Sequence, residues 1–197
     1  MAKEFSYSFV APRLRDLDSM PGELLVVSLF EDERPPRGLA GLVDWRMDGL
    51  VSRMRAVTIN PDLPNPHFKS MVLGTFGAAG DEKLLFPPGH RLPYFRVMTV
   101  GLGQTRRFDS HRYKAAVRTI LLAASSMHVA QMTLQLPGWQ VAGLPARRAA
   151  DVFITELIAV RQAGGHPPTS VCLVEALDHQ AEMDEKLCEV LGRGGRR

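Results

Sequence analysis

Blocks of apolar residues separated by polar turns predict that strands and helices alternate along this chain. The continuous apolar runs at 24–30 and 96–100 are typical of strands buried on both faces of a sheet. Residues 5–9 instead alternate apolar and polar side chains with period two, which predicts a half-buried strand. The same reasoning predicts further short strands at 83–86, 129–136 and 171–176.

Apolar residues at helical spacing predict helices between these strands. The first runs from Gly38 to Ala56, although Gly49 weakens it near its middle. A second begins after Asp109, whose carboxylate is expected to cap it, with Phe108 and Tyr113 as a hydrophobic staple. The other two are a helix whose first turn contains Pro145, extending to about residue 163, and a last helix capped by Asp178.

Strands that alternate with helices imply right-handed crossovers and a sheet covered on both faces. We therefore expect a three-layer α/β/α fold with a mostly parallel, mixed sheet. Residues 1–192 are expected to form one domain, which contains a proline-rich surface loop at 57–70. Residues 193–197 are expected to be a basic, flexible tail.

Composition excludes some classes of protein. The net charge of +3 equals the three arginines of the tail, so the body of the chain is close to neutral, which gives little support to nucleic-acid binding. No apolar run approaches the roughly 20 residues that span a bilayer, and no signal core follows Met1, so we expect a cytoplasmic protein with no membrane contact. Cys172 and Cys188 are expected to be buried thiols, with a redox pair as the alternative.

Several segments together resemble the non-catalytic amino-terminal domain of the leucyl aminopeptidase family. The resemblance rests on the helix that follows Asp109 and on four other segments: ELLVVSLF (23–30), GLAGLVDWRMDGLVSRM (38–54), TFGAAGDEKLLF (75–86) and RVMTVGLG (96–103). The resemblance implies that catalytic residues and metal ions belong to a separate carboxyl-terminal domain. No segment here is similar to the family's NTDAEGRL signature, so we expect the domain to stand alone, with no catalytic residue, no metal and no cofactor.

The same resemblance implies a macro-domain-like fold, because the two folds are related. Macro domains bind ADP-ribose with glycine loops, and the run GWQVAGLP at 138–145 lies where one such loop is expected. GLAG at 38–41 resembles the other phosphate loop at a helix start, where backbone amides favour an anion. The ligand-binding hypothesis therefore names five residues: Gly38, Gly41, Gly138, Trp139 and Gly143.

Two observations compete with this hypothesis. Glu31, Asp32 and Glu33 stand where ADP-ribose-binding macro domains usually have an asparagine-rich run, and these acids would repel a diphosphate. The glycines can equally serve only as tight turns, and Trp139 can cover the core rather than stack on a ligand.

The functional expectation is a non-catalytic binding or assembly module whose partner is another protein or a second copy of the chain. The first alternative is a domain that binds ADP-ribose or another nucleotide. The second is a DNA-binding accessory protein that contacts nucleic acid through the arginine tail at 193–197.

Overall fold

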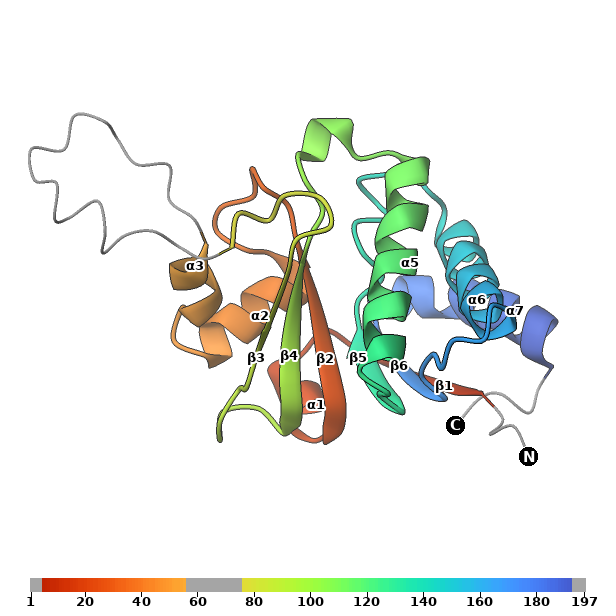
Figure 1. Ribbon diagram of the computed structural model, residues 1–197, viewed down its shortest axis with the longest axis horizontal. Helices are drawn as coiled ribbons and strands as arrows, with labels where there is room; N and C mark the ends of the chain where they lie inside the picture. The colour runs from red at the N-terminus through yellow and green to blue at the C-terminus, as the bar shows by residue number, and fades with distance from the viewer. Residues whose placement is uncertain (1–4, 56–75, 193–197) are drawn as a thin grey trace, which may run out of the picture.

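The computed structural model places one six-stranded sheet between two layers of helices (Figure 1). It describes residues 5–55 and 76–192. The strand order is β1-β6-β5-β2-β4-β3, and every pairing is parallel except the antiparallel pair of β3 and β4. The strands are β1 (Ser6–Val10), β2 (Gly22–Leu29), β3 (Lys83–Phe86), β4 (Tyr94–Gly101), β5 (Gln131–Leu134) and β6 (Ser170–Val174).

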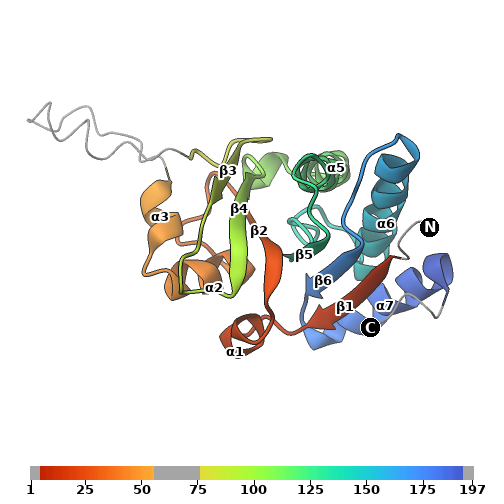
Figure 2. The ribbon, with the colours of Figure 1, turned by 60° about the horizontal axis from the view of Figure 1, so that its bottom comes forward.

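Two groups of helices pack on opposite faces of this sheet (Figures 1 and 2). One layer contains α1 (Leu14–Asp18), α2 (Gly38–Arg46) and α3 (Leu50–Met54). The other contains α5 (Ser110–Ser126), α6 (Ala146–Gln162) and α7 (Leu177–Leu191), and the 3-10 turn η1 (Thr105–Arg107) precedes α5. The expected three-layer α/β/α fold with a mostly parallel, mixed sheet is confirmed.

Strand β2 lies inside the sheet and contributes to both hydrophobic cores. Leu24 and Val26 belong to the cluster under α5, α6 and α7. Leu25, Val27 and Leu29 alternate with them and belong to the cluster under α1, α2 and α3. The continuous apolar run in the sequence therefore reflects burial on both faces, as predicted.

Two helical predictions were wrong in detail. The single helix expected from Gly38 to Ala56 is two helices, because Asp48 and Gly49 adopt left-handed backbone conformations (φ 53° and 74°) that end α2 before α3 begins. Asp178 does not cap α7: Ala176 is the N-cap residue, without a side-chain bond, and Asp178 lies in the first turn. The predicted cap at Asp109 is confirmed, since its side chain accepts a hydrogen bond from the Arg112 amide at 2.9 Å.

The chain leaves the neighbouring strands β2 and β5 toward opposite faces of the sheet. From β2 it continues to α2 in one layer, and from β5 to α6 in the other. In open α/β sheets such a switch point leaves a crevice at the carboxyl ends of the strands. The fold therefore indicates where a ligand site would form.

Two predicted segments, the proline-rich loop at 57–70 and the tail at 193–197, fall outside the described residues. The expectation that 1–192 forms a single domain stays a prediction. Within 5–55 and 76–192, no helix has the length and apolar character needed to cross a bilayer.

Candidate functional site

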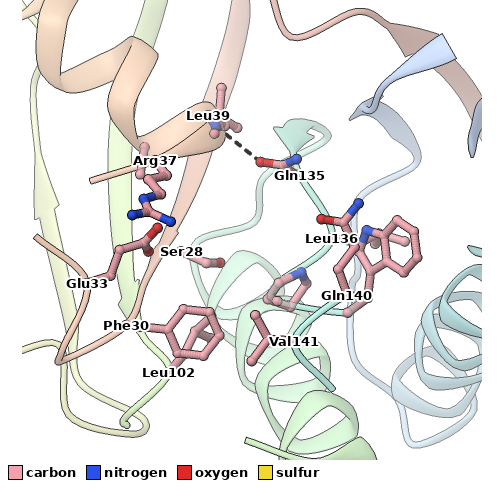
Figure 3. A pocket seen from close by; sticks show the side chains of 15 residues that line it. Ser28, Phe30, Glu33, Arg37, Leu39, Leu102, Gln135, Leu136, Gln140 and Val141 are labelled. Atoms are coloured by element: carbon pink, nitrogen blue, oxygen red, sulfur yellow. Dashed lines mark hydrogen bonds between the residues drawn. The ribbon is translucent and has the colours of Figure 1, made fainter. Parts of the chain in front are cut away.

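A cleft of about 310 Å³ opens at the carboxyl ends of β2 and β5 (Figure 3). One wall is the segment from Ser28 to Ala40, which includes the end of β2 and the start of α2. The other wall is the segment 135–141, which follows β5. Leu102, after β4, closes the cleft from the side of the core. We call these two segments the β2 wall and the β5 wall.

A buried arginine holds the β2 wall in place. Arg55 follows α3 and is 1% exposed. Its guanidinium donates to the backbone carbonyls of Phe30 (2.7 Å), Glu31 (2.8 Å) and Glu33. Burial lowers the pKa of Arg55, but an arginine stays charged at any pH that proteins tolerate. One cation thus satisfies three carbonyls of the turn that follows β2.

The three acids of this turn do not all face the cleft. Asp32 is turned away, because its carboxylate accepts from the amide (2.9 Å) and the hydroxyl (2.6 Å) of Thr105, and these bonds lower its pKa. Glu33 lines the cleft, where its carboxyl lies beside the Arg37 guanidinium (Figure 3). Burial raises the pKa of Glu33, and the charge of Arg37 partly opposes that rise. Neither Glu31 nor Asp32 lines the cleft, so the expected acidic repulsion reduces to the carboxyl group of Glu33 with a cation next to it.

The last part of the β2 wall is the amino-terminal end of α2. Gly38 has a left-handed backbone (φ 55°) and starts the helix. The amide of Leu39 donates to the side-chain oxygen Oε1 of Gln135, on the β5 wall, at 3.1 Å (Figure 3). A direct hydrogen bond therefore joins the two walls.

A buried glutamate holds the β5 wall. Glu175 follows β6, is 1% exposed, and accepts from the indole Nε1 of Trp139 at 3.1 Å. Burial raises the pKa of Glu175 to about 7, and the hydrogen bonds from Trp139 and from the backbone of Leu136 and Ala176 oppose that rise. This carboxyl group is thus set to titrate near neutral pH.

Trp139 is part of the core at this wall. It is 6% exposed, and His179 of α7 meets its ring edge to face at 5.0 Å. Gln140, one residue further along, contacts the imidazole of His179 at 3.3 Å. The indole is therefore held between Glu175 and His179, which favours its role as a cover of the core over the stacking of a ligand.

The structure brings together three of the five residues named from the sequence. Gly38, Gly138 and Trp139 line the cleft. Gly41 lies in a separate hollow beside Trp45, and a Cβ there would come within 2.7 Å of the Pro36 carbonyl oxygen. Gly143 does not line the cleft either, and a Cβ there would meet nothing within 4 Å. The ligand-binding role of all five residues stays a prediction.

Sequence reasoning did not find Arg55, Gln135 or Glu175. Glu175 ends an otherwise apolar strand pattern, so a charged residue at that place was the available signal. Arg55 and Gln135 are ordinary polar residues beside loops, and only their contacts distinguish them. Across 5–55 and 76–192, no three His, Cys, Asp or Glu side chains gather as they would around a metal ion.

Comparison with known proteins finds similarity to the aminopeptidase family in sequence and to macrodomains in fold. Residues 72–158 match the cytosol aminopeptidase family, N-terminal domain. No curated protein sequence matches the chain.

Solved structures with a similar fold come from both groups. The Oceanobacillus iheyensis macrodomain with ADP has a TM-score of 0.62 and 14% identity, over 92% of this chain and 90% of that one. The Trypanosoma brucei macrodomain in complex with ADP-ribose has a TM-score of 0.60 and 14% identity, over 92% and 69%.

A mutant of tomato leucine aminopeptidase has a TM-score of 0.57 and 15% identity. The match covers 98% of this chain but 38% of the aminopeptidase, so the chain spans well under half of that enzyme. With the family match at 72–158, these likenesses confirm the resemblance seen in the sequence: residues 72–158 are similar to the N-terminal domain of the cytosol aminopeptidase family, and the fold is macrodomain-like.

Proposed function

We propose that this chain is a non-catalytic binding module and that its ligand site is the cleft between the β2 wall and the β5 wall. The observation that carries the proposal is the position of the cleft at the switch point between β2 and β5. Its volume of about 310 Å³ lies at the lower end of the range for small-molecule sites.

The lining supports a small polar ligand with an apolar face. Phe30, Leu102 and Val141 supply apolar surface, and Gln135 and Gln140 supply amide groups. Ser28 also lines the cleft, and its hydroxyl oxygen is buried without a hydrogen-bond partner. A buried polar atom without a partner is costly, so a ligand that forms a hydrogen bond with it binds more favourably.

The experiment is a titration of the isotope-labelled chain with adenosine, ADP-ribose and a panel of free nucleobases, followed by amide chemical shifts. We expect at least one compound to shift the amide signals of Gly38, Leu39 and the 135–141 segment. Most other amide signals of the chain should stay unchanged. The proposal is contradicted if no compound changes the amide shifts at the cleft, or if the changes are confined to another surface.

A blocking variant with a matched control sharpens this test. Val141 lines the cleft and is 42% exposed, so Val141→Trp fills the opening without entering the core. Val190 of α7 is 41% exposed and does not line the cleft, which makes Val190→Trp the control. We expect Val141→Trp to weaken binding about tenfold or more and Val190→Trp to leave it unchanged.

ADP-ribose is the first nucleotide to test, because the Trypanosoma brucei macrodomain with a similar fold is described in complex with it. A thermal shift with ADP-ribose that Val141→Trp removes would favour the nucleotide alternative. A substitution at Gly143 is a weaker test of binding in the cleft, because Gly143 does not line it.

Assembly through the sheet edge is the second candidate. Among the described strands β3 ends the sheet, and the β3–β4 pair exposes Leu85 (46%) and Phe95 (78%). Exposed apolar side chains at a strand edge favour association with another chain. Light scattering is expected to show an oligomer that Leu85→Ser with Phe95→Ser converts to monomer, whereas Leu177→Ser on α7 has no effect. A monomer in the unmodified protein would remove self-assembly as a function.

A further inference from the structure

Gln135 lines the cleft. It directly follows the last residue of β5, and its Oε1 accepts a hydrogen bond from the Leu39 amide, 96 positions away in the sequence, at 3.1 Å. Figure 3 shows this bond crossing the cleft from the β5 wall to the start of α2. An oxygen of the chain itself therefore lies against the amino-terminal end of this helix.

The backbone at Gly38 is fitted to that oxygen. A Cβ at position 38 would lie 2.8 Å from Oε1 of Gln135, and the φ of 55° is one that glycine adopts without strain. Phosphate-binding loops use glycine so that an anion can approach the backbone. Here the group that approaches is the amide oxygen of Gln135.

Gln135 also provides what the helix end otherwise lacks. The N-cap residue Arg37 makes no side-chain hydrogen bond to the helix, and the first turn of α2 contains no acidic residue. Helix amino termini are stabilised by an oxygen acceptor with negative charge, either from a side chain or from a bound anion. The Gln135 oxygen fills this place from the end of β5, the strand beside β2.

The charged groups of the cleft leave little attraction for an anion. Among the described residues that line it, Glu33 and Arg37 are the charged ones, and they lie side by side (Figure 3). The two charges have opposite signs, so the lining carries no net positive charge from its side chains. A phosphate group would meet a satisfied helix end and a neighbouring carboxylate.

We propose that Gln135 determines the specificity of the cleft: its side chain stands in for a phosphate oxygen at α2, so the cleft admits uncharged polar ligands and excludes phosphate esters. The inference rests on the proposed function of the cleft. It predicts that removal of this one side chain turns the cleft into an anion site.

The test compares pyrophosphate binding by the unmodified chain and by Gln135→Ala, with calorimetry at low salt. We expect Gln135→Ala to bind pyrophosphate at least about tenfold more tightly, with an affinity that falls as salt is added. Gln135→Ser is the second variant, since its hydroxyl is too short to reach the Leu39 amide. Gln140→Ala is the matched control, because Gln140 also lines the cleft but contacts His179 rather than α2.

Hydrogen exchange at the Leu39 amide supplies an independent reading. Exchange is expected to accelerate about tenfold in Gln135→Ala and to slow again when pyrophosphate is added. Equal pyrophosphate binding by the unmodified chain and by both Gln135 variants, whether tight or absent, would overturn the proposal. This result is separate from the titration with uncharged compounds, whose failure would count against the cleft as a ligand site.

Discussion

The two walls of the cleft are held by buried residues of opposite charge. The cation Arg55 binds three backbone carbonyls of the β2 wall, whereas the carboxyl group of Glu175 accepts N–H groups from the β5 wall. A guanidinium keeps its charge throughout the working range of pH, but the pKa of Glu175 is raised to about 7. The comparison shows that the residue holding the β2 wall keeps its charge, while the residue holding the β5 wall titrates near neutrality.

The largest expected effect comes from removal of the cation of the β2 wall. Arg55→Met leaves the carbonyls of residues 30, 31 and 33 without their buried donor. We expect the free energy of unfolding to fall by about 3–5 kcal/mol, measured by chemical denaturation. Arg53→Met, two residues earlier on α3, is the control, since Arg53 is exposed and its replacement should cost less than about 1 kcal/mol. Similar losses for the two variants would show that the carbonyl contacts of Arg55 add nothing special.

The next effect is the pH dependence of the β5 wall. Because the folded state raises the pKa of Glu175 from 4.5 to about 7, it holds the proton more tightly than the unfolded chain does. The resulting stabilisation is fully present below about pH 4.5 and is lost as the pH rises through about 7. Between about pH 5 and pH 8 this group should lower the free energy of unfolding by about 2–3 kcal/mol.

Glu175→Gln tests that prediction, because the amide keeps the shape of the side chain and does not titrate. We expect its free energy of unfolding to change less between about pH 5 and pH 8 than that of the unmodified chain, by about 2–3 kcal/mol. Trp139 reports on the wall directly by fluorescence when the other tryptophan, the exposed Trp45, is replaced by phenylalanine. Parallel pH profiles for the two proteins would refute the assignment to Glu175.

A smaller effect is expected from the indole that binds Glu175. Trp139→Phe removes the Nε1–H donor but keeps an aromatic ring in the core. Because the hydrogen bond from Trp139 lowers the pKa of Glu175, its loss should move the titration of stability to higher pH. The free energy of unfolding should also fall by about 1–2 kcal/mol above that titration, followed by circular dichroism. A midpoint that stays in place would show that the indole bond does not govern the carboxyl group.

The smallest expected loss of stability comes from removing the imidazole of His179, which packs against the Trp139 indole. His179→Ala removes the edge-to-face contact at 5.0 Å, and we expect a cost of about 0.5–1 kcal/mol. His111 on α5 is exposed and does not line the cleft, so His111→Ala measures the effect of losing an imidazole elsewhere. A cost for His111→Ala as large as that for His179→Ala would remove the role given to the aromatic contact.

Local features of the sequence predicted most of the fold. The buried strand β2, the cap at Asp109 and the alternation of strands and helices each depend on residues close together in the chain. The break at Asp48 and Gly49 was only half anticipated, since glycine in a helical pattern signals a weak point but not whether the helix ends there. The sequence named four glycines and one tryptophan for a ligand site because they lie in predicted loops or at a helix start. Three of these five residues line the cleft.

The sequence by itself therefore determined the layers of this protein, because burial periodicity and helix capping act over a few residues. Only the tertiary structure decided what the cleft is made of. The bonds from Arg55 to the turn after β2, from Trp139 to Glu175 and from Leu39 to Gln135 join segments 22 to 96 positions apart. Such contacts exist because β5 lies beside β2 with its helix on the opposite face, and no local pattern of side chains encodes that strand order.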